Sequence, residues 1–243
     1  MFPVGTRPAR AARKSSPAPT AAAEAVRGRK GDLTRAAILD AALAIARRDG
    51  LEGLTIGAIA ERLGMSKSGV FAHFGSREDL QLAVLRDYAA RFVQTVLRPA
   101  VHEPRGLPRL HAIVDRWLAL LAEEIEAGCI LISGASEYDD RPGPLHDALV
   151  AIVVAWKGEL LTALEQARQC GHLRADADCE QLVFEIYGLM LMLHQEARLL
   201  HGQDSMRRAR LGLQRLINAS AAASQRRSRG GRKIGPARAT DHP

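Results

Sequence analysis

The stretch that decides the fold runs from residue 55 to residue 74 and reads TIGAIAERLGMSKSGVFAHF. Thr55 is a suitable N-cap, because its hydroxyl can accept from the free amides of a first helical turn. The apolar residues that follow recur with helical spacing and predict one buried face on a helix of about two turns: Ile56, Ile59, Ala60 and Leu63. Gly64 then supplies the left-handed residue that ends a helix with least strain.

A second short helix is predicted to begin after Ser66, another good N-cap residue, and to end at about His73. Its predicted inward-facing side chains are Val70, Phe71 and Phe74. Small, polar and basic residues occupy the predicted outer face: Lys67, Ser68, Gly69, Ala72 and His73. A helix with such residues near its N-terminal end can approach base edges closely, which is the arrangement of the recognition helix in a helix-turn-helix.

The next segment strengthens this interpretation, because it opens a further helix with a capping box from Ser76 to Asp79. Residues 32–92 resemble the DNA-binding domain of TetR-family transcriptional regulators. The matching positions are Glu52-Gly53-Leu54-Thr55, Ile59-Ala60-x-x-Leu63-Gly64, Ser66, Gly69-Val70-Phe71-x-His73-Phe74 and Ser76-Arg77-Glu78-x-Leu80. Two positions depart from the family pattern. Phe71 replaces the usual Tyr and lacks a hydroxyl that often bonds a phosphate, while Arg77 replaces the usual Lys and changes the donor geometry.

The resemblance implies that the matched positions contact double-stranded DNA. Lys67 and Ser68 are expected to reach base edges or adjacent phosphates, and Gly69 lets the backbone come close beside the small Ala72. The remaining residues are expected to contact phosphates through side chains or amides: Thr55, Ser66, His73 and Arg77.

Two assignments in this region stay open between alternatives. Phe71 either packs on the sugar backbone of DNA or belongs to the protein core. Arg27, Arg29 and Lys30 precede the first helix closely enough to enter a neighbouring minor groove as an arm. A solvated tail that adds non-specific affinity is the more ordinary interpretation of these three cations.

The composition favours an all-α chain. Hydrophobic residues make up 47% of the 243 residues and aromatic residues only 4%, so a core would rest on Leu, Ala, Val and Ile. No segment shows the alternation expected of strands. The predicted organisation is a disordered basic tail at 1–31, a helix-turn-helix domain at 32–92, a helical effector-binding and dimerisation domain at 93–220, and a second disordered basic tail at 221–243.

The formal net charge of +7 is unevenly distributed. Seven Lys or Arg against one Glu give residues 1–31 a charge of +6, and six against one Asp give residues 221–243 a charge of +5. The remaining residues, 32–220, are therefore acidic by four charges. Net basicity is weak evidence for a DNA-binding surface on the folded part of the chain.

Other function classes find little support in the residues. The histidines lack the spacing of metal ligands, no glycine-rich phosphate loop follows a strand, and the acidic clusters at 123–126 and 137–140 are expected to be solvated faces. Neither an enzyme, a metal nor a cofactor is expected. Three cysteines without paired spacing argue against a disulfide framework and fit a reducing cytoplasm, although a redox-sensing role stays open. Neither a signal peptide nor a membrane span is expected.

Helical spacing predicts further helices along the rest of the chain, at 34–48, 107–125, 128–139, 145–169, 178–201 and 206–219. A long helix capped by Ser76 is predicted to stop at Pro99. This helix would join the DNA-binding head to the helical body, because it begins in the head and extends beyond it.

For the body, the resemblance implies a homodimer with a pocket for an unknown small-molecule effector. The helices at 145–169 and 178–201 are predicted to form the dimer. The pocket candidates are polar, aromatic or flexible side chains, each of which taken singly is more often a core residue: Trp117, Tyr138, Trp156, Phe184, Tyr187, Met190 and His194.

The function predicted from these features is a cytoplasmic repressor that binds a near-palindromic operator as a dimer and is released by an effector. Two alternatives stay open. One is an architectural DNA-binding protein without an effector, whose basic tails supply the affinity. The other is a helical enzyme or small-molecule carrier.

Overall fold

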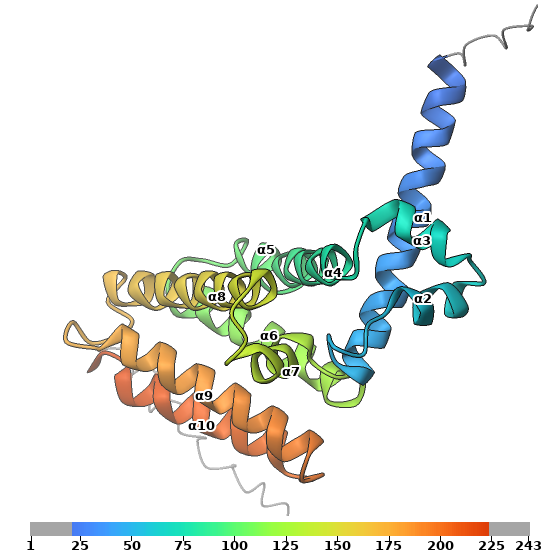
Figure 1. Cartoon of the computed structure of the whole chain (residues 1–243). Coiled ribbons are helices and arrows are strands. Elements are labelled where there is room, and N and C mark those ends of the chain that lie inside the picture. Colours follow the sequence, from blue (N-terminus) through green and yellow to red (C-terminus); the bar gives the residue numbers. More distant parts are fainter. Residues whose placement is uncertain (1–20, 224–243) are drawn as a thin grey trace, which may run out of the picture. The chain divides into compact units, whose positions relative to one another are not determined.

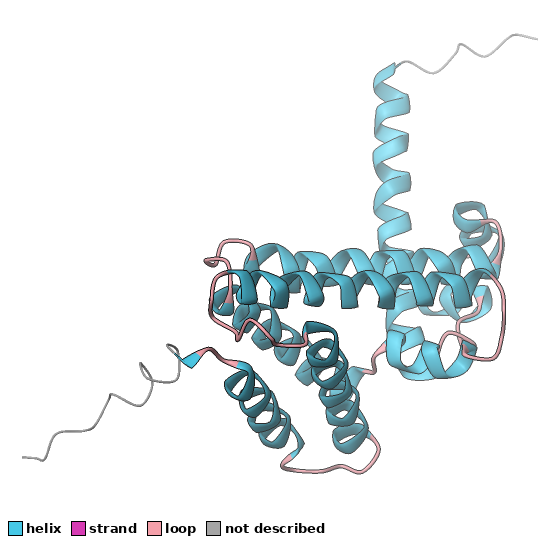
Figure 2. Ribbon diagram, turned by 90° about the vertical axis from the view of Figure 1, so that its left-hand side faces the viewer, coloured by secondary structure: helices cyan, strands magenta, loops and turns pink. Residues whose placement is uncertain are grey.

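The computed structural model describes residues 21–223, and the predicted tail residues 1–20 and 224–243 lie outside this range. The chain divides after Ala37 into two units, of which the second contains every contact discussed below. Figures 1 and 2 show that the described elements are helices joined by loops. No β-strand occurs within the described residues, and one isolated antiparallel bridge joins Leu173 to Ala221. The predicted all-α fold class is confirmed.

The first helix, α1, spans Ala21–Asp49 and therefore begins well before the predicted start at residue 34. The prediction of disorder is wrong for residues 21–31, because the Ala-rich stretch after Pro19 has high helix propensity and no proline interrupts it. The arm predicted at Arg27, Arg29 and Lys30 is thus helical backbone. The predicted C-terminal tail also begins too early, since Ala221 is buried in the bridge to Leu173.

The helix-turn-helix follows as predicted, with α2 at Ile56–Leu63, α3 at Lys67–Phe74 and α4 at Arg77–Phe92. These helices share one apolar core with α1 from Ile38 onward and with parts of α7 and α8. The side chains that are fully buried in it include Ile38, Leu51, Leu54, Ile59, Leu80 and Leu85. This core fixes α3 on the head by its inner face alone.

The helical run that leaves the head ends at Ala100, one residue after the predicted stop at Pro99. After α4 the chain makes a π-helical turn, η1, at Val93–Leu97, and α5 follows at Arg98–Ala100. Proline clashes with the carbonyl four residues earlier in a regular α-helix, and the π turn widens the backbone at that carbonyl. Pro99 thus lies in the last turn of the run, and the prediction of the stop is close to the observed end.

The body contains α6 at Leu107–Ala127, α7 at Ile130–Tyr138, α8 at Pro144–Gln169, α9 at Cys179–Arg198 and α10 at Ser205–Ser220. Figure 1 shows α9 and α10 side by side. Their apolar faces, with those of η1, α6 and α8, form a second core that includes Leu110, Leu118, Leu121, Leu160, Leu164 and Ile186. The body is thus a helical bundle held by aliphatic side chains, as the composition indicated.

Two glycines allow close approaches within this unit. Gly128 (φ 98°) lies against α1 so tightly that an added Cβ would be 1.9 Å from the carbonyl oxygen of Arg47. Gly106 (φ 100°) lies against His172, whose Nδ1 accepts from the amide of Leu107 across 3.0 Å. His172 thus caps the start of α6.

The end of the described chain is tied back to the loop between α8 and α9. The amide of Arg174 donates to the carbonyl of Ser220 across 2.9 Å, and the amide of Ala222 donates to the carbonyl of His172 across 3.0 Å. These two bonds flank the bridge of Leu173 with Ala221. The last turn of α10 is therefore fixed by backbone pairing as well as by its apolar face.

Candidate DNA-binding and effector sites

The turn of the helix-turn-helix is defined by its caps. The hydroxyl of Thr55 accepts from the amide of Ala58 across 3.1 Å, and the hydroxyl of Ser66 accepts from the amide of Gly69 across 3.1 Å. Between them Gly64 adopts a left-handed conformation, with φ 63° and ψ 30°. Both hydroxyls therefore satisfy helix amides in the free protein, and the phosphate contacts predicted for Thr55 and Ser66 remain predictions.

The outer face of α3 is open, as predicted. Lys67, Ser68 and Ala72 are exposed, whereas Val70 and Phe74 anchor the helix in the core. Gly69 and His73 are half-buried. The predicted base-contacting side chains therefore lie together at the free N-terminal end of one short helix, the geometry that entry into a major groove requires.

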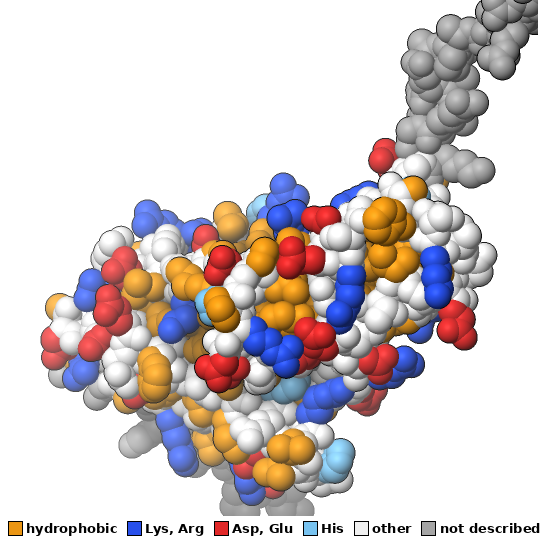
Figure 3. Space-filling view, viewed as in Figure 1, with side chains coloured by type: hydrophobic (Ala, Val, Ile, Leu, Met, Phe, Trp, Pro, Cys, Tyr) orange, Lys and Arg blue, Asp and Glu red, His pale blue; other side chains and the backbone are white. Residues whose placement is uncertain are grey.

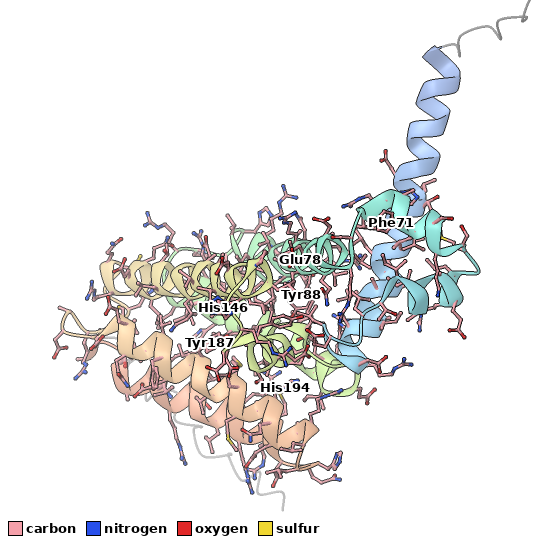
Figure 4. The ribbon with its side chains drawn as sticks, viewed as in Figure 1. Phe71, Glu78, Tyr88, His146, Tyr187 and His194 are labelled. Carbon is pink, nitrogen blue, oxygen red and sulfur yellow. The ribbon has the colours of Figure 1, made fainter. Side chains whose placement is uncertain are left out.

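Phe71 departs from its predicted inward orientation, since 53% of its surface is exposed. It lies one residue after the buried Val70, which is a rotation of about 100° on an α-helix, so it falls beside the core-facing row of α3 and not within it. The alternative of a core role is thereby wrong, and contact with the sugar backbone of DNA remains the prediction. Figure 4 labels Phe71 on α3.

Arg77 is bonded within the protein. Its Nε donates to the carbonyl of Leu54 across 2.9 Å, and its Nη2 donates both to the carbonyl of Glu52 and to Oε2 of the same residue, the latter across 3.0 Å. The guanidinium therefore ties the start of α4 to the loop between α1 and α2. The phosphate contact predicted for Arg77 remains a prediction beside this positioning role.

Glu52 also links the head to α7. Its Oε1 accepts from the hydroxyl of Tyr138 across 2.7 Å and from Arg141 across 3.3 Å, while its amide donates to Glu137 across 3.0 Å. The Tyr138 hydroxyl and Arg77 hold the pKa of Glu52 below its usual range, and burial together with Glu52 raises the pKa of Tyr138 to about 12. Tyr138, predicted as a pocket residue, serves instead at this junction.

A cavity of about 400 Å³ lies inside the body, between α4, η1, α6, α8 and α9 and the segment at Cys129–Ile132. Its wall is predominantly apolar, and four of the seven predicted pocket residues line it: Trp117, Trp156, Tyr187 and Met190. The other three do not. Tyr138 lies at the head junction, Phe184 is 68% exposed, and His194 is buried away from the cavity wall.

Aromatic rings form one side of this cavity. Trp156 lies edge-to-face with Phe92 (centroids 4.6 Å apart) and with Trp117 (4.8 Å), and the ring of Tyr187 is 5.8 Å from that of Trp117. The indole Nε1 of Trp156 is buried without a hydrogen-bond partner within residues 21–223. A buried donor without an acceptor is costly.

The other side of the cavity carries a polar cluster that the sequence did not predict. The hydroxyl of Tyr88 on α4 donates to Oε1 of Glu124 on α6 across 2.7 Å and lies 3.7 Å from Sγ of Cys129. Arg47 of α1 reaches the same Oε1 across 3.4 Å. Figure 4 labels Tyr88 on α4 and Tyr187 on α9.

Burial governs the titration of this cluster. It raises the pKa of Glu124, against the opposing effect of the Tyr88 hydroxyl and Arg47, raises the pKa of the Tyr88 phenol, and raises the pKa of the Cys129 thiol to about 12. A thiol with so high a pKa is a poor nucleophile, which argues against a redox-sensing role for Cys129.

Glu124 corrects the expectation that the cluster at 123–126 is a solvated face, since its side chain is 1% exposed. The helical register contained the signal. Glu124 follows Trp117 by seven residues and Leu121 by three, so it continues the buried stripe of α6. Tyr88 likewise continues the buried stripe of α4, because it follows Leu80 by eight residues and Val84 by four.

Neither a metal site nor a membrane-spanning helix is found in the part of the chain that the structure describes. No group of three or more His, Cys, Asp or Glu residues in 21–223 is arranged to hold a metal ion. None of the helices there has the length and apolarity needed to cross a membrane.

The comparisons with known proteins agree with this geometry. Residues 38–84 match the family model described as bacterial regulatory proteins of the tetR family, and residues 106–213 match the tetracyclin repressor-like C-terminal domain. The chain belongs to the TetR family of transcriptional regulators. The first match covers α1 from Ile38 onward, α2, α3 and the first half of α4, and the second runs from the start of α6 into α10.

Individual TetR-family relatives are similar over different shares of the chain. The transcriptional repressor AcnR of Corynebacterium efficiens is 39% identical over 91 residues, which are 37% of this chain and 48% of that protein. The chain thus matches about half the length of this curated relative. A TetR regulator from Chloroflexus aurantiacus has a TM-score of 0.71 at 26% identity, with 79% of this chain and 98% of that one covered.

A regulator from Saccharomonospora viridis, solved in complex with choline, has a TM-score of 0.66 at 21% identity and shares the fold over 77% of this chain and 96% of its own. Membership of the TetR family makes this chain a DNA-binding transcriptional regulator. The predicted DNA-contacting residues lie on one short helix, and the cavity lies elsewhere, in the helical body.

Proposed function

We propose that the protein is a homodimeric repressor that leaves a near-palindromic operator when a small molecule occupies the body cavity. The observation that carries this proposal is the position of Glu124. Its carboxylate lines the cavity and is also ion-paired with Arg47, close to the C-terminal end of α1. Because α1 packs in the core of the head, the cavity wall and the DNA-binding unit share a charged contact.

The mechanism is a shift between two populations. In a dimer the two α3 helices must be about 34 Å apart to enter successive major grooves. A ligand that binds better when α4 and α6 are displaced shifts the equilibrium away from that separation. The contacts of Tyr88 and Arg47 with Glu124 would change first, since all three belong to different helices.

The dimer is proposed to form through the long C-terminal helices. Both α8 and α9, the predicted pair, expose apolar side chains: Val150, Val154, Phe184, Leu191 and Met192. The support is stronger for α9, because Gly188 and Leu189 also line a shallow groove shared with Gly212 and Leu216 of α10. Small residues at such a groove allow another helix to approach closely.

Two observations favour an effector over a purely architectural role. The cavity encloses about 400 Å³ and is lined mainly by apolar side chains with few polar groups, which is typical of small-molecule sites. The Saccharomonospora viridis regulator was solved with choline, which is consistent with a ligand-binding body in this fold. The charged side chains on the face in Figure 3 are of both signs and interspersed, so this face gives no support to binding by bulk charge.

The experiment is selection of operator sequences from a random duplex library, followed by titration of the complex with a panel of small molecules. A repressor with an effector yields a near-palindromic sequence and at least one compound that releases it. Sequence-independent binding that disappears in salt would support the architectural alternative, and no DNA binding at all would support the enzyme or carrier.

A further inference from the structure

We propose that the cavity selects an organic cation: a protonated amine or quaternary ammonium group on an apolar body. This inference rests on the proposed effector site and specifies the chemistry of its ligand. It depends on the charges and rings that the cavity presents.

The charged side chains that line the cavity are all acidic. Glu124 and Glu159 line it, and no Lys, Arg or His side chain does so among the described residues. Arg47 touches Glu124 without lining the cavity. An anionic ligand would therefore meet two carboxylates and no cation inside the wall, whereas a cation would meet a carboxylate in a partly desolvated site, where charge-assisted bonds are strong.

The rings provide a second reason for a cation. Phe92, Trp117, Trp156 and Tyr187 come from four different helices and line the same cavity. Aromatic faces attract ammonium groups, and Trp does so most strongly. Tyr187 already shows this preference within the protein, because Nζ of Lys157 lies 5.9 Å from the centroid of its ring.

The cavity also has a suitable size for an organic cation with an apolar body. The cavity volume of about 400 Å³ lies within the usual range for sites that enclose a small molecule.

Binding of a cation in the cavity also affects a contact with the DNA-binding head. Glu124 holds Arg47 through Oε1, which Tyr88 shares. A ligand cation competes with Arg47 for the same carboxylate, and the contact between α6 and α1 weakens as the ligand binds. The charge of the ligand is then what weakens the contact between Arg47 and Glu124. An uncharged molecule of the same shape would bind without weakening this contact.

The test is a charge series on one body: 4-phenoxybutylamine, 4-phenoxybutan-1-ol and 4-phenoxybutanoate, titrated into the full-length protein without DNA and followed by calorimetry. We expect the amine to bind about tenfold or more tighter than the alcohol, from ring and carboxylate contacts together, and the carboxylate to bind weakest. Equal affinity of amine and alcohol, or tighter binding of the carboxylate, would overturn the proposal.

Variants of the cavity wall test which side chains cause the preference for the amine. Glu124→Gln should remove most of the preference for the amine over the alcohol, and Glu123→Gln, an exposed neighbour outside the cavity wall, should leave it unchanged. Trp156→Phe should weaken binding of the amine more than binding of the alcohol, because Trp attracts ammonium groups more strongly than Phe does. If Glu124→Gln does not fold, the wild-type series still decides, because the proposal requires the amine to bind tighter than the alcohol and the carboxylate to bind weakest.

Release of operator DNA is measured separately with the same compounds. A charge preference in binding without any release of DNA would uphold the ligand class and contradict the proposed repressor mechanism. Release of DNA by the alcohol as readily as by the amine, at equal occupancy, would contradict the route through Arg47.

Discussion

The side-chain amide of Gln81 donates to the carbonyl of Leu51 across 2.6 Å inside the core of the head. With the bonds of Arg77 to Leu54 and Glu52 one turn earlier on α4, it fixes three carbonyl groups of the loop between α1 and α2. This loop leads directly into α2. The orientation of the helix-turn-helix therefore depends on polar side chains of α4 as much as on the apolar core.

Arg77→Ala should lower the free energy of unfolding by about 1–2 kcal/mol, because two backbone carbonyls lose a partner. DNA affinity should fall with it. Chemical denaturation and binding to selected and random duplexes measure the two effects. Weaker DNA binding at unchanged stability would instead assign Arg77 to a phosphate contact alone.

Lys67→Ala should weaken binding to the selected operator by about 1–3 kcal/mol and reduce discrimination against random duplex, if Lys67 reads a base edge. Fluorescence anisotropy on both duplexes provides the measurement. Lys157→Ala, a change on the body, is the matched control and should bind both duplexes as the wild type does. An equal loss on the two duplexes would show that Lys67 contacts phosphate only.

Gly128→Ala should destabilise the protein strongly, by about 2 kcal/mol or more. The backbone there has φ 98°, which strains any L side chain, and the new Cβ would meet the Arg47 carbonyl oxygen at 1.9 Å. Gly158→Ala is the control, because Gly158 lies in α8 with open space around it, and alanine there should be neutral or stabilising. Thermal unfolding of both variants decides, and equal melting temperatures would contradict the close approach.

The stability of the protein should fall as the pH drops below about 6.5, in part because of His194. Burial and the nearby Arg198 lower the pKa of His194, so the unfolded chain takes up a proton before the folded chain does. The stabilisation is complete above the usual histidine pKa of about 6.5 and is lost as the pH falls towards the lower folded value. His194→Gln should flatten this part of the pH–stability curve, whereas His201→Gln, an exposed change, should not. A slope unchanged in His194→Gln would assign it to other groups.

Leu189→Glu should convert the proposed dimer to monomer and abolish operator binding, because the new charge would lie in the groove between α9 and α10. Sedimentation velocity measures the first effect and anisotropy the second. Val154→Glu tests α8 in the same way, at a side chain that is 63% exposed. Dissociation by Val154→Glu alone would move the interface to α8, and a wild-type monomer that still binds its operator tightly would contradict the dimer altogether.

The sequence predicted the helices and their buried faces well, because helical spacing is a local property. The caps at Thr55, Ser66 and Ser76 and the register of α6 follow from residues three or four positions apart. The departures from the predicted helix ends also have local causes. Helix propensity extends α1 to Ala21, and the π turn accommodates Pro99 within the helical run.

The candidate sites were harder to predict because they depend on which helices meet. Trp117 and Trp156 are 39 positions apart and yet in edge-to-face contact. The bonds of Arg47 and Tyr88 to Glu124 likewise join three separate helices. Sequence spacing gave no information on these partners, and it left Glu124 in a cluster that was expected to be solvated. It also offered no means to separate Phe184, on the surface, from Tyr187, at the cavity.

The backbone pairing of residues 172–174 with 220–222 sets where the chain can be altered for experiments. A truncation before residue 220 would remove the carbonyl that accepts from Arg174 and the bridge partner of Leu173. The loop before α9 and the end of α10 would both become less ordered. Fluorescent or affinity tags for the assays above therefore belong after residue 223. A shortened protein made for crystallisation should keep Ala222 as its minimum C-terminal boundary.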